Sequence, residues 1–252
     1  MLAKERHDKI YRMIKSNGAV TTSDLVAVFG VSIETIRRDL LCMEQEGLLL
    51  RVHGGAVEKG GMKPYLNLDE RNKSFSTQKR NLALTATKFI SDGDVIGIDA
   101  GSTAILFSEA LKDKFSNLTV ITYSLDVFNI LKENFNVILC GGYFMNGENY
   151  FYGPHTVDML SKLHIQKAFI CPSAISLEHG IFDYQKDAYM IQKQMFKSSD
   201  EIFILADSSK FEKKALLKLD DMKTEYNYIT DCDLSPDLAK LYNQNNININ
   251  FK

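Results

Sequence analysis

The chain has 252 residues, of which 45% are hydrophobic and 25% are charged, and it contains 15 Gly and 4 Pro. This balance permits an ordinary globular core and excludes a disordered or collagen-like protein, and the length favours two domains. The 30 basic and 32 acidic residues give a net charge of −2, so any nucleic-acid surface must be a local one.

The N-terminal residues alternate charged with apolar side chains, unlike a signal peptide, and no window of the sequence is long enough to cross a membrane. The four Cys are widely spaced, and the five His do not cluster with them at zinc-ligand spacing. We therefore expect a cytoplasmic protein with reduced thiols and with no membrane partner, metal or cofactor.

Residues 1–57 follow the pattern of a winged helix-turn-helix. A first helix with an apolar stripe is followed by Thr21, which is suited to cap a second helix. Gly30 ends that helix, and Ser32 caps a third one directly afterwards. Two capped helices joined by so tight a turn are typical of the helix-turn-helix. The inner face of the second helix is expected to carry Leu25, Val28 and Phe29.

The third helix has an apolar face and a polar, cationic one, and the alternating run after Gly47 predicts a short hairpin, the wing. Arg37 and Arg38 lie about 100° apart around the helix axis. One can therefore reach base edges while the other holds a phosphate, in an order that the spacing leaves open. The predicted DNA-binding residues are Ser32, Glu34, Thr35, Arg37, Arg38, Arg51 and His53.

Residues 54–64 are the part of the chain richest in Gly and Pro, and they separate two differently patterned regions. We place a linker at residues 58–74 and a larger domain at residues 75–252. In that domain, strands and helices alternate from about residue 77 to residue 243, which predicts an α/β fold with a mostly parallel sheet. The Asn-rich end could be a frayed tail or an edge strand.

A buried strand that ends at Asp99 is followed by a loop of small residues and an apolar helix. Such a loop offers backbone N–H groups and a helix N-terminus to an anion, although loops of this kind also simply cap helices. Other small or polar residues recur where later strands end, and in a parallel sheet these ends share one edge. The predicted anion-site residues are Lys79, Asp99, Gly101, Ser102, Thr103, Tyr123, Ser124, Gly141, Gly142, Asp207 and Lys210.

Residues 31–56, VSIETIRRDLLCMEQEGLLLRVHGGA, resemble the helix-turn-helix signature of the DeoR family of bacterial transcriptional regulators. The low net charge of +1 over residues 1–57, from eight basic and seven acidic residues, would otherwise also suit a helical protein-interaction module. From residue 70 onward, the order ERNKSFSTQKR, DAGST, ITYS, CGG, YGP, KAFI, ADSSKF and ITD is similar to the sensor domain of the same family.

The resemblance implies a sensor fold similar to that of pentose-phosphate isomerases, with a pocket for a phosphorylated sugar or related metabolite. It assigns this effector to Lys79, Lys210 and the loop from Asp99 to Thr103. The chain departs from the family pattern at Ser102, where Thr is usual, at Tyr123, where Asn is usual, and in the less Gly-rich residues 170–176. These departures concern the part of the pocket that faces the sugar.

An aldose–ketose isomerase needs a carboxylate beside the reacting carbons. Similar isomerases carry an Asp-rich turn after the strand that corresponds to residues 167–171, whereas this chain has no acid there before Glu178. We therefore expect a regulator and not an enzyme: a repressor of carbohydrate genes, with an isomerase carrying an accessory helical module as the alternative. Because one winged module buries little DNA, we expect a homo-oligomer, a dimer or tetramer, on a double-stranded operator.

Overall fold

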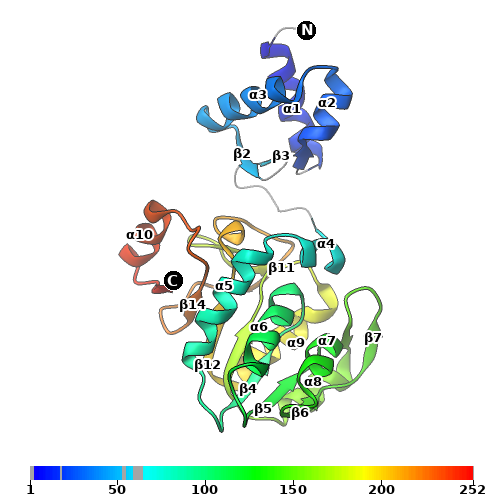
Figure 1. The fold of residues 1–252 in the computed structure, drawn as a ribbon, viewed down its shortest axis with the longest axis vertical. Coiled ribbons are helices and arrows are strands. Elements are labelled where there is room, and N and C mark those ends of the chain that lie inside the picture. Colours follow the sequence, from blue (N-terminus) through cyan, green and yellow to red (C-terminus); the bar gives the residue numbers. More distant parts are fainter. Residues whose placement is uncertain (1–2, 18, 53–54, 59–64, 252) are drawn as a thin grey trace. The chain divides into compact units, whose positions relative to one another are not determined.

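The computed structural model describes residues 3–17, 19–52, 55–58 and 65–251. The chain forms two compact units, Met1–Tyr65 and Leu66–Lys252, and Figure 1 draws the first in blue and the second from cyan to red. The second unit begins inside the predicted linker of residues 58–74, because residues 68–73 form the helix α4 with a buried Leu68. The part of that predicted linker from Leu66 onward therefore belongs to the second unit.

The first unit is a winged helix-turn-helix, as predicted. Its three helices bury the side chains of Ile10, Leu25, Ile36, Leu40 and Met43 in one core. Its strands form an antiparallel sheet in the order β1-β3-β2. The elements are α1 (Ala3–Asn17), β1 (Ala19–Thr21), α2 (Thr22–Phe29), α3 (Ile33–Gln45), β2 (Leu49–Val52) and β3 (Gly55–Glu58).

Local capping signals place the ends of α2 and α3. Thr21 Oγ1 accepts from the Asp24 N–H at 3.1 Å, and Ser32 Oγ accepts from the Thr35 N–H at 3.2 Å. Gly30 ends α2 with a φ of 63°, a left-handed conformation that favours glycine. The burial expected for Val28 is wrong, because that side chain is 59% exposed. A two-turn helix has a narrow inner face, and Val28 falls outside it.

The second unit is built on a parallel sheet of seven strands in the order β15-β14-β12-β9-β4-β5-β6. Alternate residues of the central strand β9 enter different cores: Phe169 packs with residues of α5, α6 and α7, whereas Ala168 and Ile170 pack with residues of α8, α9 and α10. Helices thus cover both faces, which confirms the predicted α/β class. The sheet strands are β4 (Val95–Ile98), β5 (Thr119–Thr122), β6 (Asn136–Leu139), β9 (Ile165–Ile170), β12 (Ser199–Leu205), β14 (Asn227–Ile229) and β15 (Ile249–Asn250).

The helices and two small antiparallel sheets complete this unit. The helices are α4 (Leu68–Lys73), α5 (Ser76–Ala86), α6 (Ser102–Lys112), α7 (Leu125–Leu131), α8 (Pro154–Ser161), α9 (Lys186–Lys197) and α10 (Pro236–Gln244), with single 3-10 turns η1 (Thr87–Phe89) and η2 (Ser208–Lys210). A hairpin pairs β7 (Tyr143–Met145) with β8 (Tyr150–Tyr152), and a second sheet holds β10 (Ala174–Ser176), β11 (Gly180–Asp183) and β13 (Leu217–Asp220).

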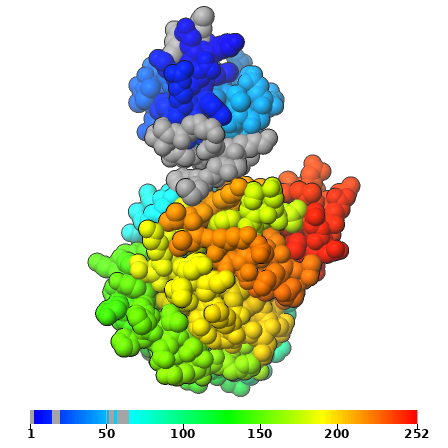
Figure 2. Space-filling view, turned by 180° about the vertical axis from the view of Figure 1, so that it is seen from behind, coloured from blue at the N-terminus to red at the C-terminus, as the bar shows by residue number. Residues whose placement is uncertain are grey.

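The C-terminal segment ends in an edge strand. Ile249 and Asn250 pair in parallel with β14, and Figure 2 shows the C-terminal residues in red against the orange segment that precedes them. Of the two alternatives left open by the Asn-rich sequence, the structure selects the strand.

Candidate functional site

The exposed side of α3 carries the residues predicted to contact DNA. Glu34, Arg37 and Arg38 are all exposed, and Arg37 Nη1 lies 3.6 Å from Glu34 Oε2. Within the described ranges, no carboxylate lies at ion-pair distance from Arg38. Ser32 and Thr35 share a hydrogen bond of 2.8 Å between their hydroxyls at the start of the helix. The second turn of α3 therefore presents one paired guanidinium, that of Arg37, and one without a carboxylate partner in the described ranges, that of Arg38.

The wing strand β2 is attached to the end of α3. The Arg51 N–H donates to Glu44 Oε1 at 2.8 Å, and Arg51 Nη1 lies 4.0 Å from Glu44 Oε2. Glu44 thereby fixes the strand that carries Arg51 beside the helix. His53, the last of the predicted DNA-binding residues, lies outside the described residues.

A buried ion pair sets α1 against α3. Arg6 donates to the Asp39 carboxylate through Nε at 2.5 Å and through Nη2 at 2.9 Å, and His7 Nε2 lies 3.0 Å from Asp39 Oδ1. Burial tends to raise the pKa of Asp39, but the hydrogen bonds from Arg6 and His7 outweigh it and hold that pKa below its usual value. The charged side chain of Asp39 thus positions the helix that carries the predicted contacts with DNA.

The predicted anion loop follows β4 and leads into α6. Gly101 is the N-cap residue with φ 105° and ψ −179°, a conformation that is essentially restricted to glycine. No side chain caps α6, so its first N–H groups have no side-chain partner. Ser102 and Thr103 are 6% and 2% exposed, and Thr103 Oγ1 is buried without a hydrogen-bond partner among the described residues. The loop combines a bare helix N-terminus with an unused hydroxyl.

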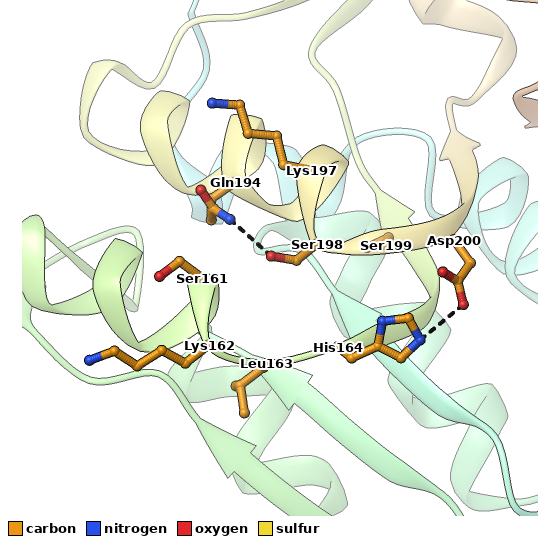
Figure 3. Close-up of a pocket in the computed structure, with 9 residues that line it drawn as sticks. All are labelled: Ser161, Lys162, Leu163, His164, Gln194, Lys197, Ser198, Ser199 and Asp200. Carbon is orange, nitrogen blue, oxygen red and sulfur yellow. Dashed lines mark hydrogen bonds and ion pairs between the residues drawn. The ribbon is translucent and has the colours of Figure 1, made fainter.

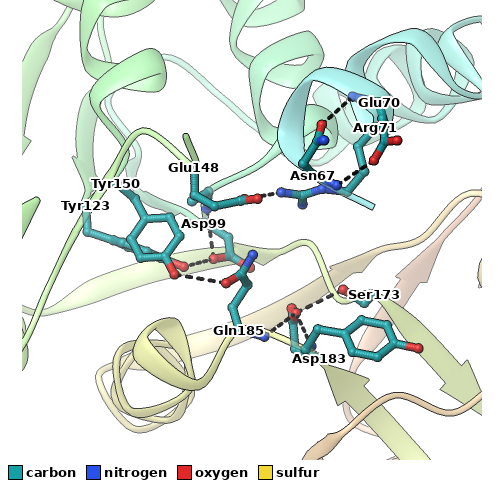
Figure 4. Close-up of polar contacts among 12 residues, drawn as sticks. Asn67, Glu70, Arg71, Asp99, Tyr123, Glu148, Tyr150, Ser173, Asp183 and Gln185 are labelled. Carbon is teal, nitrogen blue, oxygen red and sulfur yellow. Dashed lines mark hydrogen bonds and ion pairs between the residues drawn. The ribbon is translucent and has the colours of Figure 1, made fainter. Parts of the chain in front are cut away.

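A cavity of about 20 Å³ lies beside this loop. Such a volume holds about one water molecule, so a sugar phosphate could enter only if side chains moved. In Figure 4, the Arg71 and Glu148 side chains point toward each other at this cavity. The cavity is lined by Arg71, Ala100, Gly101, Tyr123, Glu148, Tyr150, Cys171, Asp183, Gln185, Ala188 and Gln192.

Asp99 organises the wall of the cavity from a fully buried position. Its carboxylate accepts from Tyr123 Oη, from the Ala100 N–H at 2.8 Å and from the Cys171 N–H at 2.9 Å. Gln192 Nε2 donates to Asp99 at 3.1 Å and to Asp183 at 3.0 Å, and so links the two carboxylates. Burial raises the pKa of Asp99, although most of these hydrogen bonds oppose the shift.

The remaining strand-end residues mainly hold their own loops. Ser124 caps α7 by accepting from the Val127 N–H at 3.3 Å. A side chain at Gly142 would collide with Tyr152 O at 2.4 Å, so this glycine permits a close backbone contact. Gly141 accepts from Thr156 Oγ1 at 3.0 Å through its carbonyl. Asp207 caps η2 through the Ser209 N–H at 3.1 Å. None of these four predicted residues lines the cavity.

Neither of the two predicted cations, Lys79 and Lys210, lines the cavity, although the charges of both act on Cys171, which does. Burial raises the pKa of Cys171 well above its usual value, and the charges of Lys210 and Lys79 partly oppose that shift. Lys210 is partly exposed on η2, whereas Lys79 is 3% exposed. Lys79 Nζ donates to Arg71 O at 2.5 Å and to Ser74 O at 2.8 Å, and so holds the C-terminal end of α4.

Several residues of the cavity are not among the predicted anion-site residues. Arg71 falls in the predicted linker, within the string ERNKSFSTQKR that resembles the family's sensor domain, and Glu148 lies in a hairpin turn 77 residues further on. Asp183 reaches the cavity from β11 and bonds to Ser173 Oγ at 2.9 Å. The cavity thus contains a carboxylate, although the turn after β9 supplies none. Only the folded chain brings these residues together.

A second hollow lies at the opposite edge of the sheet, where β9 and β12 begin (Figure 3). Four of its polar side chains form two pairs: His164 Nε2 lies 3.0 Å from Asp200 Oδ2, and Gln194 Nε2 donates to Ser198 Oγ at 2.9 Å. Ligands of open parallel sheets bind at the carboxyl ends of the strands. We therefore assign the candidate site to the other edge.

Two further properties concern the described ranges as a whole. No helix in them combines the length and apolar character needed to cross a membrane. No group of three or more His, Cys, Asp or Glu in the same ranges is placed to hold a metal ion.

A winged helix-turn-helix followed by an α/β unit with an anion-type loop defines a DNA-binding regulator with a separate sensor unit. Comparison with known proteins agrees with this class. Residues 6–59 match the DeoR-like helix-turn-helix domain, and residues 74–232 match the DeoR C terminal sensor domain. The chain belongs to the DeoR family of transcriptional regulators.

Several relatives cover nearly the whole chain, and two of them illustrate the match. The L-fucose operon activator of Haemophilus influenzae is 32% identical over 96% of this chain and 97% of its own length. The lactose phosphotransferase system repressor of Lactococcus lactis is 32% identical over 97% of each chain. Both regulate transcription, which confirms the choice of a regulator over an enzyme. Ribose 5-phosphate isomerase A from Neisseria gonorrhoeae matches 53% of this chain and 52% of its own with a TM-score of 0.41 and 19% identity, too little to carry an inference.

Proposed function

We propose that the chain is a cytoplasmic repressor of carbohydrate genes that binds a double-stranded operator and responds to a phosphorylated sugar. Family membership supports the regulatory role, and the names of both relatives refer to sugar uptake or use. One of them is an activator. Repression is the simpler proposal because it requires only that the protein occupy the operator, whereas activation also requires a surface that recruits the transcription machinery.

On the DNA side, we propose that α3 lies in the major groove and that Arg38 reads a base while Arg37 holds a phosphate. Arg38 has no carboxylate partner in the described part of the chain, so its guanidinium is available for bidentate contact with a base. Arg37 Nη1 lies 3.6 Å from Glu34 Oε2, so Glu34 already occupies one side of this guanidinium. A single contact with a phosphate tolerates this arrangement better than a bidentate contact with a base does. Two modules on half-sites one helical turn apart would require a homodimer or a tetramer.

On the effector side, the observation that carries the proposal is the Thr103 hydroxyl. A buried hydroxyl without a partner costs about 1–3 kcal/mol, and this one lies in the first turn of a helix whose N–H groups lack a side-chain cap. A phosphate at this position would accept from Thr103, Ser102 and the adjacent N–H groups, and the helix dipole would favour its charge. Lys210 on the neighbouring loop would add a mobile cation.

The experiment compares the full chain with its Thr103→Val and Ser108→Ala variants. Valine keeps the shape of threonine and removes only the unused hydroxyl. Ser108 is a control on the same helix, since its hydroxyl is buried and already bonded to Ala104 O at 2.8 Å. Thermal shifts are measured with glucose 6-phosphate, fructose 1-phosphate and inorganic phosphate, where a ligand at 100 times its Kd stabilises by about 2.7 kcal/mol.

We expect Thr103→Val to weaken binding by about 10- to 150-fold, the equivalent of one charge-assisted hydrogen bond of about 1.5–3 kcal/mol. The stability of this variant without ligand should be unchanged or higher. Ser108→Ala should bind as the unmodified chain does. Equal affinity in Thr103→Val would place the phosphate elsewhere, and absence of binding by all three compounds would refute a phosphorylated effector of this kind.

A further inference from the structure

Arg71 supplies the positive charge at the candidate cavity. It extends from α4, and a Cβ at Gly101 would lie 3.1 Å from Arg71 Nη1, so the guanidinium lies directly against the anion loop. Arg71 Nε is buried and has no hydrogen-bond partner among the described residues. The guanidinium therefore has unused hydrogen-bonding capacity beside the bare N-terminus of α6.

Glu148 is the present partner of Arg71. It lies in the turn between β7 and β8, is 7% exposed, and accepts a short charged hydrogen bond from Arg71 Nη2. Asp183 places a second carboxylate on the cavity wall. The charged groups that line the cavity are thus one cation and two carboxylates. A phosphate dianion would meet net repulsion here for as long as Glu148 kept its position.

We propose that Arg71 binds the anionic group of the effector and that Glu148 is an internal competitor, which neutralises Arg71 while the effector is absent. This proposal rests on the effector site proposed above. A carboxylate and a phosphate both match the fork of an Arg guanidinium, so one anion can replace the other without rearrangement of the cation. The small volume of the cavity has the same explanation, since Arg71 and Glu148 fill the space that an effector would need.

The exchange of partners would act on two backbone segments, the helix α4 and the turn between β7 and β8. α4 begins at Leu68, three residues after the boundary that follows Tyr65. Lys79 fixes the carbonyls of Arg71 and Ser74 at the other end of this helix. A new partner for Arg71 therefore acts on the first helix after the linker, and the release of Glu148 acts on the β7–β8 turn. A ligand can shift such an equilibrium only through differential contacts, and this exchange supplies them.

The test measures the Kd of inorganic phosphate for the full chain by calorimetry at constant ionic strength. Glu148→Gln removes the competitor and should bind phosphate at least about 10-fold more tightly. Arg71→Gln removes the cation and should bind about 10- to 150-fold more weakly. The matched controls are Glu109→Gln and Arg80→Gln, which remove the same charges from an exposed pair 3.9 Å apart on α6 and α5 and should change the Kd by less than about 2-fold.

The two substitutions should change the affinity for phosphate in opposite directions. This result distinguishes the exchange from a purely structural ion pair, in which both substitutions would weaken binding or leave it unchanged. A gain of affinity in Glu148→Gln cannot arise from misfolding, and circular dichroism verifies the fold of Arg71→Gln. Unchanged or weaker binding by Glu148→Gln, or unchanged binding by Arg71→Gln, overturns the proposal. The Thr103→Val variant tests the effector site itself. A normal Kd in that variant contradicts the proposed phosphate loop, whereas the Glu148→Gln and Arg71→Gln variants test the exchange of partners.

Discussion

The ion pair between Arg6 and Asp39 should determine whether the first unit folds at all. Asp39→Asn leaves the Arg6 guanidinium buried, with one acceptor in place of a charged partner. The side chains of this pair are 9% and 7% exposed, and removal of one partner of a buried pair costs about 3–5 kcal/mol. A core in a unit of this size rarely supplies more than about 3–5 kcal/mol. The substitution should therefore unfold much of the first unit.

Hydrogen exchange on the full chain measures this effect locally. In Asp39→Asn, the amides of α1 and α3 should lose most of their protection at pH 7, while those of α6 in the second unit serve as an internal reference. Glu34→Gln is the control for stability, because its partner Arg37 is 61% exposed and such pairs contribute at most about 1 kcal/mol. Normal protection of α1 and α3 in Asp39→Asn would refute the reasoning.

The same pair gives a pH dependence with a defined sign. The pKa of Asp39 is lowered in the folded unit, so protonation favours the unfolded state. The contribution of Asp39 is fully present above the unfolded pKa of about 3.9. It is lost as the pH falls below that value through the folded pKa. Protection of α1 and α3 should decrease in this acidic range in the unmodified chain, and the part due to residue 39 should be absent from Asp39→Asn.

Three further predictions concern the two sites. In thermal denaturation, Gly101→Ala should destabilise the second unit by about 1–3 kcal/mol, because φ 105° is strained for alanine. The control Gly141→Ala, with no atom within 4 Å of the new Cβ, should change the stability by less than about 0.5 kcal/mol. Arg38→Ala should cost roughly 1–3 kcal/mol at one operator position in a binding assay, and an equal loss on all sequences would instead make it a phosphate contact. Purified protein should not isomerise sugar phosphates, because Asp183 is bonded to Ser173 and Gln192; turnover in an NMR assay that Asp183→Asn abolished would contradict this.

Local sequence patterns predicted the features that depend on neighbouring residues. Thr21, Gly30 and Ser32 mark the ends of their helices through hydrogen bonds between residues three or four positions apart. The buried strand, small loop and helix around Gly101 are equally local. The alternation of strands and helices predicted a parallel sheet, and the structure contains one. Polar residues follow its strands, as the sequence also indicated. These features can be predicted from the sequence because capping and hydrophobic periodicity depend on residues within one or two helical turns of each other.

Long-range packing brings the residues of the candidate cavity together. Gly141, Gly142 and Asp207, which are predicted anion-site residues, hold their own loops in the folded chain and do not line the cavity. No sequence pattern indicated that Arg71, in the predicted linker, contacts Glu148 in a distant turn. A strand end gives a position along the sheet edge, whereas the direction of a side chain and its partner depend on how hairpins and helices pack over that edge. Contacts between residues 77 positions apart therefore follow from packing, which no local pattern encodes.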